Sequence, residues 1–329
     1  MMSDSFTPAK WLSNGHVQTM WPFIFRKVPN LIRQRERCVT PDDDFFDVDW
    51  YGDGEKGIVI LMHGLTGCSS SHYILGMQDI LTQEGYTTAA INFRACSGEP
   101  NLKAASYHAG FTQDINQLYQ NIRNKNPQTA IYTVGFSLGG NIMLKWLAEK
   151  ASELDISGAV AISVPFKLAN CADRVDQGLS RIYRYHLISE MKKKLLNKLN
   201  FFKANNLLNE AKKLEALGDI SWIKSFWEFD DHVVARLHAF DDVHDYYKKN
   251  SSIGFLKDIQ TNTLLVQAKD DPFLTPTVIP ELELLSPTTR LEVVDNGGHV
   301  GFISRLENDE LGFWLEQRVP NFLDSLKKR

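Results

Sequence analysis

The stretch Ala130-Ile-Tyr-Thr-Val-Gly-Phe-Ser-Leu-Gly-Gly-Asn-Ile-Met-Leu144 decides the fold. Its first residues, 130–134, form a short apolar run typical of a buried strand, and residues 141–150 are rich in good helix formers. Gly-Phe-Ser-Leu-Gly lies between them and predicts a sharp, strained turn at Ser137. Such a turn needs glycine on both sides of the serine, because a Cβ there would collide with neighbouring backbone. The stretch therefore predicts a strand, a tight turn and a helix in immediate succession.

Strand and helix patterns alternate on both sides of this stretch. Short apolar runs predict further strands at residues 57–62, 86–93, 158–164, 263–267 and 290–294. Apolar residues spaced three and four apart predict helices at 73–84, at 111–122 and from about 307 to 326, the last bent or broken near Pro320. This alternation predicts an α/β fold with a mostly parallel central sheet flanked by helices.

One long segment interrupts the alternation. No buried strand is apparent from about Phe166 to Gly254, and apolar residues between 188 and 202 recur at helical spacing. We therefore expect a core made of residues 1–165 and 255–329, with a helical cap, residues 166–254, inserted between its two parts.

Composition narrows the class of protein. The chain has 329 residues, of which 43% are apolar and 23% charged, a mixture typical of a globular protein with a sizeable core. Its 36 basic and 40 acidic side chains give a net charge of −4, so no overall positive field favours nucleic acid, and we expect no nucleic-acid partner. Cys38, Cys68, Cys96 and Cys171 form no CxxC pair, which argues against a zinc site and fits a reducing compartment. The sequence does not indicate an oligomeric state.

The chain also lacks the patterns of export and of membrane insertion. Residues 1–10 carry no basic segment followed by an apolar stretch of the kind that a secretory signal requires. The longest clean apolar runs, such as residues 58–62, are far below the roughly 20 residues needed to cross a bilayer. We therefore expect a cytoplasmic protein.

Three residues placed after predicted strands favour nucleophilic catalysis. A serine hydroxyl needs a general base to accept its proton and a third group to orient that base. Asp270 and Asp271 follow the strand at 263–267, and His299 follows the strand at 290–294, so the order is Ser, Asp, His. We interpret Ser137 as the nucleophile, His299 as the base and Asp271 as the orienting acid. The adjacent Asp270 remains an alternative, although a G-x-x-D-P pattern in the loop favours Asp271.

The loop His63-Gly-Leu-Thr-Gly67 follows the first buried strand. Its position resembles that of the oxyanion loop of α/β hydrolases, which donates backbone N–H groups to a developing oxyanion. The resemblance implies the N–H groups of Leu65 and Leu138 as these donors. His63 itself we interpret as a group that orders the loop by hydrogen bonding.

The resemblance extends along nearly the whole chain and is closest to the YheT-like family of α/β hydrolases. It rests on Asn14-Gly-His-Val-Gln-Thr19, His63-Gly-Leu-Thr-Gly67, Asn92-Phe-Arg-Ala-Cys-Ser-Gly-Glu-Pro-Asn101, Tyr107-His-Ala-Gly110, Gly135-Phe-Ser-Leu-Gly-Gly-Asn141, Phe229-Asp-Asp231, Ala268-Lys-Asp-Asp-Pro-Phe273 and Gly297-Gly-His-Val-Gly-Phe302. It implies an α/β-hydrolase fold and a serine esterase acting on short- or medium-chain or lipid-like esters, with no cofactor and no metal. The implied catalytic residues are Ser137, Asp271 and His299.

Two other functions remain open at this point. Acyl transfer to an alcohol uses the same serine chemistry, with the alcohol in place of water. A protein that keeps the fold only to bind a ligand, without catalysis, belongs to a different class, since a fold does not guarantee activity.

A lysine-rich run marks the predicted cap. Seven lysines and one acid, Glu210, lie between Met191 and Lys213. The run suits either a solvated helix face or a weak contact with an anionic membrane surface.

Several further side chains have two interpretations each. His16 lies either at the mouth of the site or in an anchor for the N-terminal arm. Arg94 and Glu99 fit either a substrate contact or ion pairs. The acidic segment Glu228-Phe-Asp-Asp231 fits helix capping or a cation site, and we assign no metal there.

Overall fold

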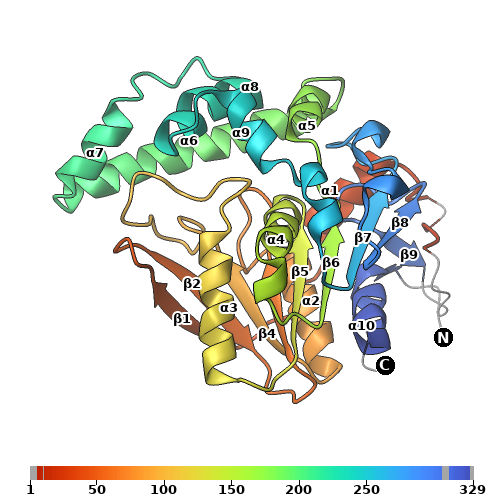
Figure 1. The fold of residues 1–329 in the computed structure, drawn as a ribbon. Coiled ribbons are helices and arrows are strands. Elements are labelled where there is room, and N and C mark those ends of the chain that lie inside the picture. Colours follow the sequence, from red (N-terminus) through yellow and green to blue (C-terminus); the bar gives the residue numbers. More distant parts are fainter. Residues whose placement is uncertain (1–5, 10, 306–310, 327–329) are drawn as a thin grey trace.

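The computed structural model describes residues 6–9, 11–305 and 311–326. Its main sheet has eight strands in the order β1-β2-β4-β3-β5-β6-β7-β8 (Figure 1). These strands are β1 (Gln34–Val39), β2 (Phe45–Tyr51), β3 (Ile58–Met62), β4 (Thr87–Asn92), β5 (Ile131–Phe136), β6 (Gly158–Ile162), β7 (Thr263–Ala268) and β8 (Thr289–Val294). All pairs from β4 to β8 are parallel, so the predicted α/β class is confirmed.

Helices cover both faces of this sheet. On one face, α2 (His72–Gln83) and α10 (Leu315–Ser325) bury apolar side chains such as Ile74 and Val319. On the other face, α3 (Gln113–Lys125) and α4 (Leu138–Glu149) bury Ile115 and Ile142. The central strands β3, β5, β6 and β7 are buried throughout, because they are covered from both sides.

The N-terminal part holds elements that the apolar patterns do not reveal. Helix α1 (Gly15–Phe25) is capped by the side chain of Asn14. Strands β1 and β2 then form an antiparallel hairpin at the edge of the sheet, and β2 also pairs antiparallel with β4. The sequence of β1, Gln-Arg-Glu-Arg-Cys-Val, has no apolar run, since an edge strand exposes much of its surface.

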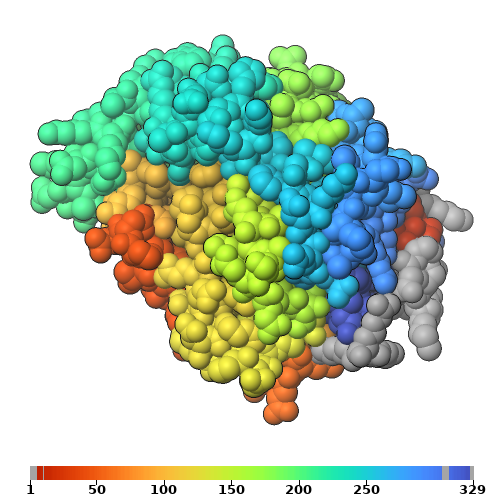
Figure 2. Space-filling model, viewed as in Figure 1, coloured from red at the N-terminus to blue at the C-terminus, as the bar shows by residue number. Residues whose placement is uncertain are grey.

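Residues 166–254 contain only helical elements, as the absence of a buried-strand pattern in this segment predicts. The helices are α5 (Leu168–Val175), α6 (Ser180–Ala204), α7 (Leu208–Glu215), α8 (Phe226–Phe229), the π-helical η2 (Asp230–Ala235), α9 (Val243–Asn250) and the short η3 (Ser252–Gly254). Together they cover the ends of the parallel strands (Figure 1), and in the space-filling view these residues form the upper part of the molecule (Figure 2). Ile188, Phe202, Leu214 and Phe229 give this region an apolar cluster of its own. We call residues 166–254 the cap; these limits themselves stay a prediction.

Besides η3, the described residues contain four more short 3₁₀ helices: η1 (Ala151–Glu153), η4 (Leu256–Asp258), η5 (Pro276–Val278) and η6 (Leu282–Leu284). All four lie in connections between the larger elements.

The predicted C-terminal helix is wrong in its first part. Residues 307–310 lie outside the described residues, and Leu311–Phe313 forms strand β10, which pairs with β9 (Ile303–Arg305). Helix α10 begins only at Leu315 and continues through Pro320. Burial of Val319, Phe322 and Leu323 in the core stabilises the helix on both sides of the proline and outweighs the lost hydrogen bond.

The lysines of α6 and α7 mostly bind the protein itself. Lys192 donates to the carbonyls of Ser221 and Ile223, both at 3.0 Å, and Lys194 donates to the carbonyl of Thr66 at 3.2 Å. Lys198 is buried and donates to the carbonyls of Ala104 and Ala105 and to Ser106 Oγ, at 2.9, 3.1 and 2.8 Å. Lys203 pairs with Glu215 and Lys213 with Glu210, each at 2.7 Å. Lys192, Lys194 and Lys198 therefore fasten the cap to itself and to the core. The other four lysines of the run, Lys193, Lys203, Lys212 and Lys213, are exposed to water.

Within the described part of the chain, none of the helices combines the length and the apolar character that a bilayer-spanning segment requires.

Candidate active site

Ser137 occupies the tight turn between β5 and α4. Its backbone has a φ of 51°, a strained value for a residue with a Cβ. The turn fits because its neighbours are glycines: a Cβ on Gly139 would lie 2.4 Å from the carbonyl oxygen of His63, and one on Gly135 would lie 2.6 Å from Gly140 Cα. The predicted strand, turn and helix are thus confirmed, and Ser137 precedes the first turn of α4.

His299 joins Ser137 to Asp271. The imidazole Nε2 lies 2.9 Å from Ser137 Oγ, and Nδ1 lies 2.7 Å from Asp271 Oδ2. Asp271 is buried, and its other oxygen accepts a hydrogen bond from the Phe273 N–H at 2.8 Å. The loops after β5, β7 and β8 bring the three side chains together at the carboxyl ends of neighbouring parallel strands. In this arrangement the imidazole can accept the proton of the serine hydroxyl, while the carboxylate orients the imidazole.

Asp270, the alternative acid, has a different partner. Its Oδ1 accepts a hydrogen bond from the Gly298 N–H at 2.9 Å, and burial raises the pKa of this carboxyl. Asp270 therefore ties the loop after β7 to the loop that carries His299. Of the two neighbouring carboxylates, Asp271 is the one that contacts the imidazole.

In the loop after β3, the N–H group of Leu65 lies between two N–H groups that are hydrogen-bonded to tyrosines. The Gly64 N–H donates to Tyr73 Oη, and the Thr66 N–H donates to Tyr107 Oη, both at 3.0 Å. Among the described residues, the Leu65 N–H between them has no acceptor. Leu138 is the first residue of α4, where a helix leaves its N–H groups unpaired. The two N–H groups that the sequence singles out are thus available to a ligand at the start of α4.

His63 orders this loop, as predicted. It is fully buried, its Nδ1–H donates to the Gly64 carbonyl at 2.7 Å, and its Nε2 accepts from the Phe93 N–H at 3.3 Å. Burial lowers the pKa of His63 to about 4, which keeps the ring neutral at physiological pH.

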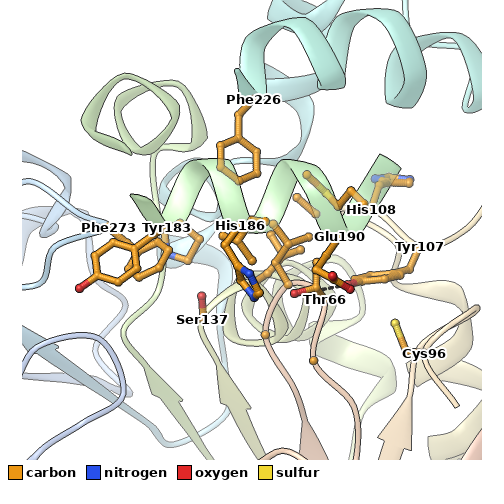
Figure 3. Close-up of a pocket in the computed structure, with 18 of the residues that line it drawn as sticks. Thr66, Cys96, Tyr107, His108, Ser137, Tyr183, His186, Glu190, Phe226 and Phe273 are labelled. Atoms are coloured by element: carbon orange, nitrogen blue, oxygen red, sulfur yellow. Dashed lines mark hydrogen bonds between the residues drawn. The ribbon is translucent and has the colours of Figure 1, made fainter. Parts of the chain in front are cut away.

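A cavity of about 970 Å³ opens at Ser137 and His299, between the sheet and the cap. Its lining is mainly apolar and includes Leu138, Leu168, Phe226, Phe229, Val233 and Leu237. Polar side chains are fewer: His186, Glu190 and Lys194 follow one another at four-residue intervals along α6. Figure 3 shows His186 and Glu190 above Ser137, with Phe226 projecting from the cap. The size and lining suit a small-molecule ligand with a long apolar part.

An aromatic stack closes one end of the site. The ring of Phe273 packs on His299 with centroids 4.4 Å apart, and Tyr183 of α6 stacks on Phe273 at 4.8 Å (Figure 3). His16 of α1 continues the series, because its Nδ1 lies 3.0 Å from Tyr183 Oη. His16 is therefore an anchor between α1 and the cap, the second of its two predicted interpretations.

A partly buried carboxyl lies in the cap wall of the cavity. Asp230 accepts a hydrogen bond from Tyr247 Oη at 2.7 Å, and burial raises the pKa of Asp230 to about 7. Burial likewise lowers the pKa of Lys198 to about 7. Removal from water disfavours the charged form of each group.

Arg94 and Glu99 both form ion pairs, one of the two predicted interpretations. Arg94 is buried and contacts Asp42 at 2.7 Å and Asp114 at 2.9 Å, while Glu99 pairs with Arg37. Arg94 also borders the cavity, but its guanidinium is held by these carboxylates.

In the acidic segment of the cap, residues 228–231, Glu228 and Asp231 accept hydrogen bonds from backbone N–H groups at the starts of helices. Glu228 forms a capping box with Ser225, and Asp231 accepts from the Val243 N–H at 3.0 Å. Within the described ranges, no group of three or more His, Cys, Asp or Glu side chains is placed to hold a metal ion.

Sequence reasoning missed the residues that support the site from outside. Tyr107 lies within the segment Tyr107-His-Ala-Gly110, which contributed to the family resemblance but carried no assigned role. Tyr73 opens a predicted helix, in which an aromatic side chain resembles ordinary core, and Tyr183 precedes the helical spacing found between residues 188 and 202. Their roles depend on contacts between elements distant in sequence, which periodicity does not report.

Comparison with known proteins agrees with this geometry. Residues 57–306 match the family model described as "alpha/beta hydrolase fold". The chain is 34% identical to the Escherichia coli (strain K12) protein named "Putative esterase YheT", over 98% of this chain and 93% of that protein. It is 25% identical to "Phospholipase ABHD3" of Homo sapiens, over 100% of this chain and 79% of that protein.

The fold also matches solved structures. The Pyrococcus furiosus esterase Pf2001 superposes with a TM-score of 0.56 and 19% identity, over 91% of this chain and 97% of that one. The sheet order, the turn at Ser137 and these matches lead to one conclusion: the chain belongs to the α/β-hydrolase family and, within it, to the YheT-like group.

Proposed function

We propose that this protein is a serine hydrolase that cleaves carboxylic esters through an acyl-enzyme on Ser137. The observation that carries the proposal is the hydrogen-bonded line from Asp271 through His299 to Ser137 at the wall of a large apolar cavity. Ester hydrolysis in general is also supported by the relatives, which are named as an esterase, a phospholipase and a monoacylglycerol lipase.

The reaction begins with attack of Ser137 Oγ on the ester carbonyl carbon, while His299 Nε2 takes the hydroxyl proton. Asp271 holds the opposite N–H of the ring and stabilises the imidazolium that forms. The carbonyl oxygen becomes an oxyanion and accepts hydrogen bonds from the N–H groups of Leu65 and Leu138. His299 then gives its proton to the leaving alkoxide, so that the alcohol departs and the acyl group remains on Ser137.

Water completes the cycle by the same steps. His299 takes a proton from water as the hydroxide attacks the acyl carbonyl, and returns it to Ser137 Oγ as the carboxylic acid leaves. An alcohol in place of water would transfer the acyl group instead.

The cavity supports esters with an apolar acyl part, of short or medium chain length or lipid-like. Leu168, Phe226, Val233 and Leu237 offer an apolar wall in the cap, and Leu138 lies beside the nucleophile. Burying each methylene contributes about 0.8 kcal/mol, so longer acyl chains bind more tightly until the cavity is filled.

Hydrolysis of p-nitrophenyl esters of increasing acyl length tests the proposal. We expect the wild type to cleave a subset of them, and Ser137→Ala to lose about 10³-fold or more of kcat while circular dichroism reports an unchanged fold. A fluorophosphonate probe should label the wild type and not the variant. A folded wild type that neither cleaves any ester nor reacts with the probe would contradict the proposal and favour a binding role. Added alcohol separates the two reactions, since acyl transfer yields a new ester instead of the acid.

A further inference from the structure

Helix α1 and the segment after it expose many large apolar side chains. Phe23, Ile24 and Phe25 are 69%, 58% and 63% exposed, and Ile32 is 94% exposed; Val17, Met20 and Val28 are exposed as well. Single exposed apolar residues are ordinary, but a group of this kind within 16 residues is typical of a surface that binds another protein, a ligand or a membrane.

A second exposed apolar group begins the long cap helix. Leu179, Ile182 and Tyr185 lie at or just before the start of α6 and face out of the protein. The hydrogen bond between His16 and Tyr183 joins the two helices at this place, and Figure 1 shows α1 beneath the α5 end of the cap. We call the exposed apolar side chains of residues 17–32 and 179–185 the mouth rim.

The mouth rim is continuous with the cavity. Met20, Phe23 and Val28 from the α1 side and Ile182 from α6 also line the cavity that contains Ser137. The rim and the cavity thus share apolar side chains that an apolar molecule would contact on both.

The α1 part of the mouth rim lies in a stretch of sequence with basic but no acidic side chains, and near the α6 part Asp176 is paired with Arg184. No Asp or Glu occurs between Asp4 and Glu36, whereas this span contains several arginines and lysines. Arg26, Arg33 and Arg35 bind groups of the protein, while Lys27 and Arg181 are exposed beside the apolar side chains. An apolar surface flanked by cations complements a lipid surface that carries anionic head groups.

We propose that the mouth rim docks on an anionic lipid surface, with the side chains of α1 and the start of α6 inserted among the lipids. A second copy of this chain bound to the mouth rim would close the opening of the cavity, whereas a lipid surface can supply an apolar ester through that opening. The supply of an ester rests on the proposed function, but the docking does not. The lysine run of α6 and α7, by contrast, offers little free charge, since most of its amino groups bind the protein.

Co-sedimentation with vesicles tests the proposal. The probes are vesicles of phosphatidylglycerol and phosphatidylethanolamine, with pure phosphatidylcholine as the uncharged comparison. The test variant is Ile24→Ser/Phe25→Ser/Ile32→Ser, whose three residues do not line the cavity. The control is Val39→Ser/Leu208→Ser/Leu282→Ser, three apolar residues on β1, α7 and η6 that are each more than half exposed.

We expect the test variant to bind anionic vesicles about tenfold or more weakly than the wild type, and the control to bind within about twofold. Lys27→Glu/Arg181→Glu should weaken binding to anionic vesicles and leave binding to phosphatidylcholine unchanged. Hydrolysis of a short, water-soluble ester should be the same in wild type and test variant.

Three results would overturn the proposal: no binding of the wild type to either vesicle, equal binding by the test variant, or a wild-type dimer in solution that the test variant converts to a monomer. The last result would assign the mouth rim to a second copy. Repeating the binding with Ser137→Ala keeps the measurement independent of catalysis, so a failure of the proposed function does not obscure it.

Discussion

The two sides of the cavity are built by different means. On the sheet side, Ser137, Asp271 and His299 stand on loops at the ends of buried parallel strands, and close glycine contacts fix the backbone there. On the cap side, the wall is held by apolar packing and by long side chains, such as those of Lys194 and Lys198, that reach carbonyl oxygens of the core. Backbone geometry on one side allows little adjustment, whereas flexible side chains on the other allow much. We expect the sheet side to fix the chemistry and the cap side to set which ligand fits.

The sharpest test of the sheet side separates two adjacent carboxylates. Asp271→Asn should reduce kcat by about 10⁴-fold, because the amide favours the wrong tautomer of His299. Asp270→Asn keeps an acceptor for the Gly298 N–H and should cost less than about tenfold. Steady-state kinetics of the two variants on the same ester checks this, and equal losses would contradict the assignment of Asp271.

The backbone contacts at the elbow predict the next largest effect. Gly139→Ala places a Cβ 2.4 Å from the His63 carbonyl, so the turn and the loop after β3 must move apart. We expect a loss of about 1–3 kcal/mol in the free energy of unfolding, together with most of the activity. Gly254→Ala is the control, since nothing lies within 4 Å of its added Cβ. Urea denaturation measures both, and a fully stable, active Gly139→Ala would show that the turn is not constrained as described.

Tyr107, which accepts a hydrogen bond from the loop after β3, should affect kcat more than KM. Tyr107→Phe removes the acceptor of the Thr66 N–H and loosens the loop that presents the Leu65 N–H. We expect kcat to fall about tenfold with KM nearly unchanged, because the oxyanion forms only during reaction. Tyr185→Phe, at an exposed tyrosine of α6, serves as the control. A change in KM alone would instead place Tyr107 among the groups that bind the ground state.

The cap side should respond to pH through Asp230. Its pKa of about 7 in the folded protein lies above the ordinary value of 3.8, so between about pH 4 and pH 7 the folded chain holds a proton that the unfolded chain has released. The stability of the wild type therefore falls as pH rises through this range, and it stays lower above pH 7.

Asp230→Asn cannot ionise and should escape this loss. We expect the variant to melt about 2–4 °C above the wild type at pH 8, and the difference to shrink toward pH 4. Thermal melts at several pH values measure it. A difference that grows toward low pH would contradict the raised pKa.

Much of the sheet side could be predicted from the sequence because its signals are local. A buried strand is an apolar run of five or six residues, and Gly-Phe-Ser-Leu-Gly between a predicted strand and a predicted helix indicates a tight turn. Asp271 and His299 follow such strands directly, so their place at one edge of the sheet follows from parallel pairing. The missed elements are those that lack a local signal: β1 is an edge strand without an apolar run, and β10 occupies part of a stretch whose pattern predicts a helix.

The cap shows the opposite case. Its helical character and the spacing within α6 were predictable. The contacts of the lysine run were not, because a lysine that reaches a distant carbonyl looks the same in sequence as one in water. The mouth rim likewise depends on α1 lying against α6, which joins residues more than 150 positions apart through His16 and Tyr183.

The sequence by itself determined the fold class, the order of serine, aspartate and histidine along the chain and the turn that presents Ser137, since each depends on residues close together in the chain or on the direction of parallel strands. Only the tertiary structure decided that Asp271 and not Asp270 meets the imidazole, that Tyr73 and Tyr107 hold the loop around Leu65, and that the exposed apolar side chains gather at the mouth of the cavity. The physical reason is that hydrogen bonds and apolar contacts join side chains across distances in sequence that no local pattern records.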